Sequence, residues 1–219
     1  EDKRVRLHAS DRLEPLDVDV PADPSSAAFL AGLAALADDG EILLESVCVN
    51  PTRTGFFEVL RRMGAEVEEL ERRDAGGEPV ATLRVRASSL HGVRIGGEII
   101  PSLIDEIPLL ACIASRAEGE TLIEGAEELR VKESDRIATV VDNLRRAGAE
   151  IEELPDGMRI VGRRTALSGT VSTRADHRIA MAFGVLGALP GNALTIDDPS
   201  CVAVSYPSFW TDLHRVIRA

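Results

Sequence analysis

Charged side chains of different kinds crowd one short stretch, where Lys132, Glu133 and Arg136 lie within five residues. Glu133 and Arg136 are three apart and can share one helix face, whereas Lys132 can join them only if it precedes the helix. A carboxylate can move a proton, and ammonium and guanidinium groups can hold phosphate or carboxylate. The stretch is a solvated helix start, an N-cap formed by Glu133 or Ser134, or the rim of an active site; spacing alone slightly favours the first.

Other charged residues stand where strongly apolar helices are expected to begin. Asp105 precedes one such helix, and taken alone it is explained as a carboxylate that complements the helix dipole. Asp176, His177 and Arg178 precede another, and an N-cap Asp explains only part of that group. The group from Asp23 to Ser26 is explained as a cap. Helix N-termini attract anions, so several that converge would make an anion site.

A threefold internal repeat supplies the elements that position these residues. Each unit contains an Ala- and Leu-rich helix, a glycine-containing turn, an alternating strand and then a second helix. Helices as apolar as the first of each unit are expected to be buried on most sides. The apolar helix and strand of the three units lie in 27–45, 107–125 and 179–198, and the second helices lie in 52–70, 129–154 and 205–219.

The first two units share a closing sequence, LRRMGAEVEEL and LRRAGAEIEEL. Gly64 and Gly148 are expected to end their helices, and a strand follows each. Hairpin strands are expected near 82–87 and 158–163. The predicted fold is therefore α/β, with a threefold repeat of a βαβαββ-like unit, buried helices inside and sheets outside. We expect one domain over 21–219, while 1–20 is predicted to form trailing strands of a missing upstream domain or a hinge.

Composition narrows the classes of function. The chain of 219 residues has a formal net charge of -12, which excludes the basic surface typical of nucleic-acid binding. An anionic ligand therefore needs a local cluster of cations. Basic residues are almost all arginine, and Lys132 is one of only two lysines, so a compact ammonium is a meaningful choice there.

The cysteines and apolar segments carry no further chemistry. Cys48, Cys112 and Cys201 lack metal-ligand spacing and are expected to be small buried residues in a reducing compartment. No apolar run has transmembrane length and no signal peptide is visible, so no membrane partner is expected. No metal and no organic cofactor is indicated. The chain begins at Glu1, which suggests a fragment of a longer protein.

Four motifs together carry a resemblance to a known family: LRVKESDRI, DHRIAMAF, NPTRTGF with LRRMGAE, and DPSSAAF. They resemble the C-terminal half of 5-enolpyruvylshikimate-3-phosphate synthases, also called 3-phosphoshikimate 1-carboxyvinyltransferases, along essentially the whole chain. The resemblance implies an inside-out α/β barrel domain of a cytoplasmic enzyme of aromatic amino acid biosynthesis, the glyphosate target. That family transfers the enolpyruvyl group of phosphoenolpyruvate to the 5-hydroxyl of shikimate 3-phosphate, with release of phosphate.

The resemblance also implies roles for the residues that handle protons. Asp105 matches the family aspartate that contacts the shikimate hydroxyls and is proposed as the base. Glu133 matches the glutamate proposed for proton transfer at the methylene carbon. Lys132 matches the lysine near the reacting hydroxyl and the phosphate ester of shikimate 3-phosphate.

Anion binding is implied for three more residues. Arg136 and Arg178 match arginines that grip phosphoenolpyruvate, and guanidinium forks suit its carboxylate and phosphate. His177 matches a neighbouring substrate-binding histidine. One position departs from the pattern, because Val204 stands where many members have a lysine that reaches phosphoenolpyruvate.

The family's N-terminal half is missing from this chain, and the family's active site lies between the two halves. We therefore expect half of a site and no turnover by the chain alone. Two alternatives remain: a domain of the UDP-N-acetylglucosamine enolpyruvyl transferase, which shares the fold and chemistry, and a non-catalytic ligand-binding module.

Overall fold

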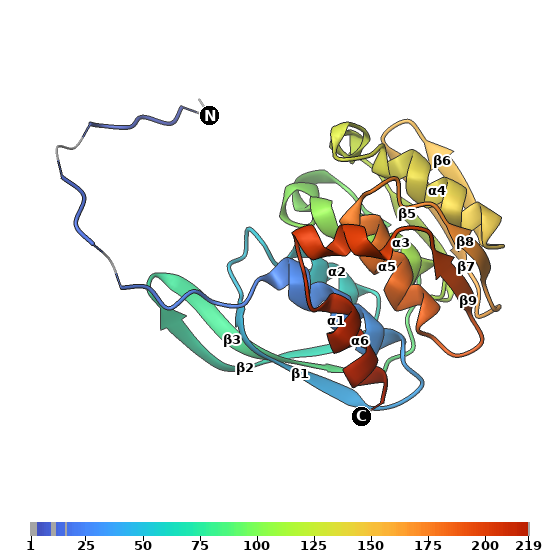
Figure 1. The fold of residues 1–219 in the computed structure, drawn as a ribbon, viewed down its shortest axis with the longest axis horizontal. Coiled ribbons are helices and arrows are strands. Elements are labelled where there is room, and N and C mark those ends of the chain that lie inside the picture. Colours follow the sequence, from blue (N-terminus) through green and yellow to red (C-terminus); the bar gives the residue numbers. More distant parts are fainter. Residues whose placement is uncertain (1–3, 10–11, 16, 219) are drawn as a thin grey trace.

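The computed structural model describes residues 4–9, 12–15 and 17–218, and Figure 1 shows how their helices and strands are arranged. Three buried helices lie at the centre and three β-sheets lie outside them. This arrangement confirms the expected α/β class with helices inside and sheets outside. The helices are α1 (Pro24–Leu36), α2 (Gly55–Arg62), α3 (Ile107–Ala114), α4 (Arg136–Arg146), α5 (His177–Gly187) and α6 (Phe209–Ile217).

Short 3-10 helices and nine strands complete the described part of the chain. The 3-10 helices are η1 (Gly97–Ser102), η2 (Ile104–Glu106), η3 (Glu127–Val131) and η4 (Pro199–Val204). The strands are β1 (Glu41–Cys48), β2 (Glu66–Ala75), β3 (Glu78–Arg86), β4 (Arg94–Ile95), β5 (Gly119–Ile123), β6 (Glu150–Leu154), β7 (Gly157–Gly162), β8 (Ser168–Val171) and β9 (Ala193–Ile196).

The central helices α1, α3 and α5 contact one another and contribute much of the hydrophobic core. Their sequences are apolar on all sides, which suits helices that are surrounded by protein. Asp23 caps α1 as expected, since its carboxylate accepts a hydrogen bond from the Ser26 amide at 2.9 Å. We call the end of the molecule where these three helices begin the helix-start pole, and the opposite end the helix-end pole.

The second helices α2, α4 and α6 are amphipathic and cover the core with one face. Gly64 and Gly148 follow α2 and α4 with φ of 100° each, the left-handed conformation expected after a helix end. Phe209 anchors α6, because its ring packs edge-on against Phe29 of α1 with ring centroids 5.7 Å apart.

The sheets repeat one strand order. The first sheet has the order β1-β3-β2 and the second β4-β5-β7-β6. In all three units a preceding segment runs parallel to the strand after the buried helix: Ala22 bridges Val47, β4 pairs with β5, and β8 pairs with β9. The third sheet has only β8 and β9, because no hairpin follows α6 in the described residues. The expected six-element unit is therefore complete only in the second repeat.

The start of the chain differs from the prediction of trailing strands. Within 4–9, 12–15 and 17–20 the structure has no strand and every residue is exposed, and in Figure 1 this segment leads away from the helices and sheets. A strand needs a hydrogen-bonded neighbour to satisfy its amides and carbonyls, and no strand among the described residues pairs with this segment. Residues 1–3, 10–11 and 16 lie outside the described part. The assignment of this segment to an upstream domain or hinge stays a prediction.

Two further expectations were tested. Cys112 is fully buried, but Cys48 and Cys201 are only half-buried, each beside an oxygen acceptor rather than in a fully apolar site. All three cysteines are free thiols. Among the described residues, no helix combines the length and apolarity that crossing a membrane requires.

Candidate active site

All six predicted site residues lie at the helix-start pole. Asp105 is in η2 immediately before α3, Lys132 and Glu133 lie between η3 and α4, and Arg136 is the first residue of α4. His177 and Arg178 open α5. Five of them, all except His177, form ion pairs with one another and with two residues described below. We call this group the polar cluster, and its members are Asp105, Glu106, Lys132, Glu133, Arg136, Asp176 and Arg178.

The start of α4 corrects one expectation. Neither Glu133 nor Ser134 caps this helix; the carboxylate of Asp135 does, by accepting a hydrogen bond from the Ala138 amide at 2.9 Å. Because the helix begins only at Arg136, Lys132 precedes it and its ammonium lies 3.8 Å from the Asp105 carboxylate. The short loop between η3 and α4 thus delivers Lys132 and Glu133 to the same region.

Arg136 forms the centre of the cluster. Its side chain is 1% exposed, and its guanidinium donates hydrogen bonds to three carboxylates at once. The distances are 2.8 Å to Asp176, 2.9 Å to Asp105 and 2.6 Å to Glu133. A buried guanidinium needs such partners because an unpaired charge is costly away from water. In this conformation the planar group orients Asp105 and Glu133.

Asp176 was expected only as an N-cap, and it has a second role. It does cap α5, since it accepts a hydrogen bond from the Arg178 amide at 2.9 Å. It also pairs with Arg136 and accepts a hydrogen bond from Ser134 at 3.0 Å. Burial alone would raise the pKa of Asp176, but Arg136, Ser134 and the capped amide together hold the pKa below its ordinary value. Asp176 therefore stays charged and keeps the buried pair intact.

Glu106 was missed in the sequence. It follows Asp105, is 4% exposed, and its carboxylate accepts a hydrogen bond from Nη1 of Arg178 at 3.0 Å. Burial raises the pKa of Glu106, while the Ser25 hydroxyl and the charge of Arg178 act in the opposite direction. The sequence did contain a signal for Glu106, because two consecutive carboxylates precede the apolar sequence IPLLACIA. A charged side chain at the start of a buried helix needs a partner of opposite charge.

Arg178 and His177 line the same region. The Arg178 side chain is 14% exposed, and its Nη2 lies 3.8 Å from the Asp105 carboxylate. His177 is half-buried, and burial followed by the neighbouring charge of Arg178 lowers its pKa. His177 is thus neutral near pH 7 and can donate or accept a hydrogen bond without adding charge.

The cluster combines carboxylates, a type of group that can transfer protons, with cations. Asp105 and Glu133 are partly exposed, with side chains 38% and 52% accessible, so a ligand can reach both. Lys132 and Arg178 offer donors to an anion beside them. Among the described residues, no group of three or more His, Cys, Asp or Glu side chains is arranged to hold a metal ion. The arrangement suits acid–base chemistry on a ligand with anionic groups.

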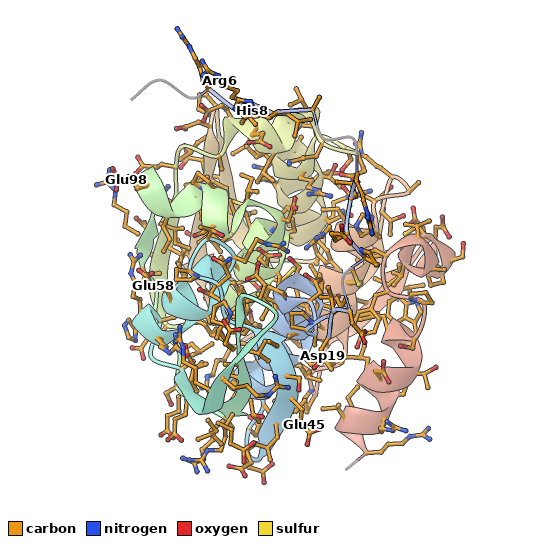
Figure 2. All side chains as sticks on the ribbon, turned by 90° about the vertical axis from the view of Figure 1, so that its left-hand side faces the viewer. Arg6, His8, Asp19, Glu45, Glu58 and Glu98 are labelled. Atoms are coloured by element: carbon orange, nitrogen blue, oxygen red, sulfur yellow. The ribbon has the colours of Figure 1, made fainter. Side chains whose placement is uncertain are left out.

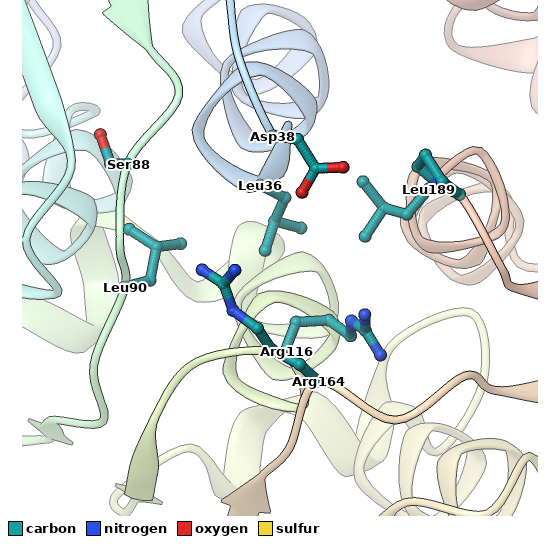
Figure 3. A pocket seen from close by; sticks show the side chains of 8 residues that line it. Leu36, Asp38, Ser88, Leu90, Arg116, Arg164 and Leu189 are labelled. Atoms are coloured by element: carbon teal, nitrogen blue, oxygen red, sulfur yellow. The ribbon is translucent and has the colours of Figure 1, made fainter.

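A small pocket lies at the helix-end pole, with a volume of about 60 Å³. Figure 3 shows Arg116 and Arg164 there, with Asp38 and Leu36 at the end of α1. Burial and then the charge of Arg164 lower the pKa of Arg116. Arg116 donates a hydrogen bond to the Thr165 carbonyl, and the negative ends of the central helix dipoles disfavour an anion here, so the pocket is a poor anion site.

Solved structures with this architecture define the class of protein. EPSP synthase from Acinetobacter baumannii superimposes with a TM-score of 0.86 and 40% identity, over 91% of this chain and 46% of that one. The enolpyruvyl transferase NikO from Streptomyces tendae shares the fold, with a TM-score of 0.61 at 20% identity. The fold is therefore that of an enolpyruvyl transferase domain.

Sequence comparison defines the family. The profile described as EPSP synthase (3-phosphoshikimate 1-carboxyvinyltransferase) matches residues 1–213, and the chain belongs to this family. The 3-phosphoshikimate 1-carboxyvinyltransferase of Sulfurihydrogenibium sp. is 51% identical over 98% of this chain and 50% of that protein. The enzyme of the same name from Persephonella marina is 51% identical over 97% and 50%. The chain therefore spans about half the length of the curated relatives it matches.

Proposed function

We propose that this chain is the C-terminal domain of an enzyme that transfers the enolpyruvyl group of phosphoenolpyruvate to the 5-hydroxyl of shikimate 3-phosphate. The observation that supports this most is the convergence of Asp105, Lys132, Glu133 and Arg178 around the buried Arg136 at the helix-start pole. Family membership supplies the reaction, and the cluster supplies groups of the kinds that this reaction needs.

The reaction is an addition followed by an elimination. The hydroxyl oxygen bonds to C2 of phosphoenolpyruvate and loses its proton to a base, while an acid protonates C3, which gives a tetrahedral intermediate. Loss of a proton from C3 then restores the double bond and expels phosphate. The site must therefore hold a base, an acid that can reverse its role, and cations for the anionic substrates.

Each group of the cluster receives one of these tasks in the proposal. Asp105 takes the hydroxyl proton, and Glu133 exchanges the proton at C3. Lys132 lies beside Asp105 and stabilises negative charge on the oxygen and on the phosphate ester. Arg178 binds phosphoenolpyruvate, with His177 beside it. Arg136 can take part in that binding only if Asp105 or Glu133 moves, because its guanidinium is enclosed by carboxylates in this conformation.

The complementary half of the relatives is the proposed partner, and it would close over the helix-start pole. Val204, at the end of η4, is 81% exposed and carries no charge toward the ligand. A cation that contacts phosphoenolpyruvate from that direction therefore has to come from elsewhere in the assembled enzyme. The cytoplasm is the proposed location.

The test is phosphate release from phosphoenolpyruvate and shikimate 3-phosphate. It is measured with this chain alone, with the N-terminal half of the Sulfurihydrogenibium relative added, and with that half joined in front of this chain. We expect no turnover by the chain alone and turnover by the joined enzyme. The joined enzyme carrying Arg178→Ala is the negative control.

Other outcomes identify the alternatives. Turnover with UDP-N-acetylglucosamine in place of shikimate 3-phosphate would reassign the acceptor substrate. If the joined enzyme is folded and releases no phosphate with either acceptor, while the chain alone binds shikimate 3-phosphate, the chain is a non-catalytic ligand-binding module and the proposal fails.

A further inference from the structure

Glu106 is a buried carboxylate whose position the reaction described above does not explain. It lies between two of the central helices, in η2 before α3, and reaches Arg178 at the start of α5. The Ser25 side chain of α1 also interacts with the Glu106 carboxylate. Arg53, before α2, donates a hydrogen bond to Ser25 at 3.3 Å. Glu106 therefore joins the starts of all three central helices.

Arg178 has two acidic neighbours that differ in accessibility. Asp105 is partly exposed, lies 3.8 Å from Nη2, and is shared with Arg136 and Lys132. Glu106 is enclosed, lies 3.0 Å from Nη1, and contacts no cation of the cluster other than Arg178 among the described residues. When Asp105 turns to a substrate hydroxyl, Arg178 keeps Glu106 as its partner.

The guanidinium is planar, so a bond to one amino group fixes the direction of the other. We propose that Glu106 is a positioning residue that holds Nη1 of Arg178 and thereby directs its Nη2 edge toward phosphoenolpyruvate. This inference rests on the proposed function. Ser25 interacts with the same carboxylate, and the accessible members of the cluster, Asp105 and Glu133, are left for the ligand.

Burial disfavours the charge of Glu106, which its raised pKa reflects. We therefore infer that the Glu106 carboxylate serves to fix the direction of a hydrogen bond, and not only to supply a negative charge. A partner that only balanced the charge of Arg178 would not have to be enclosed, since the partly exposed Asp105 is already near.

Two conservative variants in the complete joined enzyme separate position from charge. Glu106→Asp keeps the charge but is one methylene too short to reach Nη1. Glu106→Gln loses the charge but keeps an oxygen that can accept the same hydrogen bond. Glu58→Gln is the control, because Glu58 is exposed on α2 at the surface shown in Figure 2 and contacts no residue of the cluster.

We expect Glu106→Asp to raise KM for phosphoenolpyruvate about tenfold or more, with KM for shikimate 3-phosphate changed by less than about twofold. Glu106→Gln should stay within about threefold of wild type for both substrates. Thermal unfolding checks that each variant is folded. If Glu106→Asp does not fold, Ser25→Ala provides the test, and it should raise KM for phosphoenolpyruvate in the same direction.

The opposite order, with Glu106→Gln impaired and Glu106→Asp normal, would show that charge alone matters and would overturn the inference. So would equal rises in both KM values, or no change in either folded variant. Wild-type turnover is measured first. Its absence would overturn the proposed function and this inference together, whereas wild-type turnover with normal Glu106→Asp would overturn the inference alone.

Discussion

At the scale of single residues, Arg136 and Asp176 form an ion pair that is closed to water, with side chains 1% and 0% exposed. Removing one charge of such a pair leaves the other buried without its partner. We expect Asp176→Asn to lower the free energy of unfolding by about 3 kcal/mol, the lower end for such losses, because Asp105 and Glu133 still contact Arg136. Urea unfolding at pH 7 measures this. Asparagine can still cap α5, so the variant removes the charge and keeps the cap. A loss below about 1 kcal/mol, far under the range for breaking a buried ion pair, would show that the pair contributes little to stability.

The same ion pair makes the stability of the folded protein depend on pH, and the direction of that dependence follows from the pKa of Asp176. The pKa of Asp176 is lower in the folded protein than in the unfolded chain, so the unfolded chain binds the proton more readily. The contribution of Asp176 to stability is complete above about pH 4, the range of an ordinary Asp, and is lost as the pH falls through the folded-state pKa. Unfolding curves of wild type and Asp176→Asn should therefore converge in acid. Curves that stay parallel down to the acid limit would refute this linkage.

Glu133 is the residue at which the proposed proton transfer can be tested. Its side chain is half exposed and its carboxylate is held by Arg136 at 2.6 Å, which suits a group that meets the substrate. Glu133→Gln in the complete enzyme should lower kcat by about 100-fold or more while the binding of shikimate 3-phosphate changes little. Steady-state kinetics and calorimetric binding separate the two. Glu127→Gln, an exposed change in η3, is the control. Weakened binding with unchanged kcat would exclude proton transfer by Glu133.

At the scale of elements, the ends of α2 and α4 offer a matched pair of glycines. Both have φ of 100°, but a Cβ on Gly148 would meet nothing within 4 Å, whereas a Cβ on Gly64 would lie 3.1 Å from the Ser89 carbonyl oxygen and from His91. Gly148→Ala should cost about 1 kcal/mol from backbone strain alone. Gly64→Ala should cost at least about twice that, since crowding adds to the strain. Equal losses in urea unfolding would show that the contacts near Gly64 relax freely.

The repeat explains why so much of the fold was predictable. Apolar helices, amphipathic helices and the two shared tails have patterns that local propensity and burial both favour. The 3-10 helices η3 and η4 had no such pattern, and they occupy positions where the second helices were expected to begin. The helix α4 begins at Arg136, and its cap is Asp135 rather than Glu133 or Ser134.

The polar cluster was predictable only in part, for a physical reason. Residues such as Asp105, Lys132 and Arg178 stand out by their type and by the family motifs. The roles of Glu106 and Asp176 depend on which distant side chain lies opposite each of them, 72 and 40 residues away in sequence. Local spacing contains no information on such contacts, and only the packing of the three central helices brings them together.

At the scale of the whole molecule, the parallel arrangement of α1, α3 and α5 explains how an acidic chain could bind the anionic ligands that we propose. The formal net charge is -12, yet the positive ends of three helix dipoles meet where Lys132, Arg136 and Arg178 gather. The negative ends meet at the opposite pole, where Arg116 and Arg164 lie. Attraction for an anion is therefore local and depends on the whole set of central helices being in place.

The boundary between the first segment and the domain can be tested by truncation. Val5, Leu7, Leu13 and Val20 are between 79% and 100% exposed, so removing 1–20 takes away apolar surface without uncovering the core. We expect Tm to change by less than about 2 °C and self-association to decrease. Removing 1–23 is the matched control, because it also deletes Ala22, which bridges Val47, and Asp23, which caps α1 and pairs with Arg53 at 3.1 Å. That control should lower stability by about 1 kcal/mol or more. If both truncations lower Tm equally, the domain begins earlier than Pro21 and the segment is part of it.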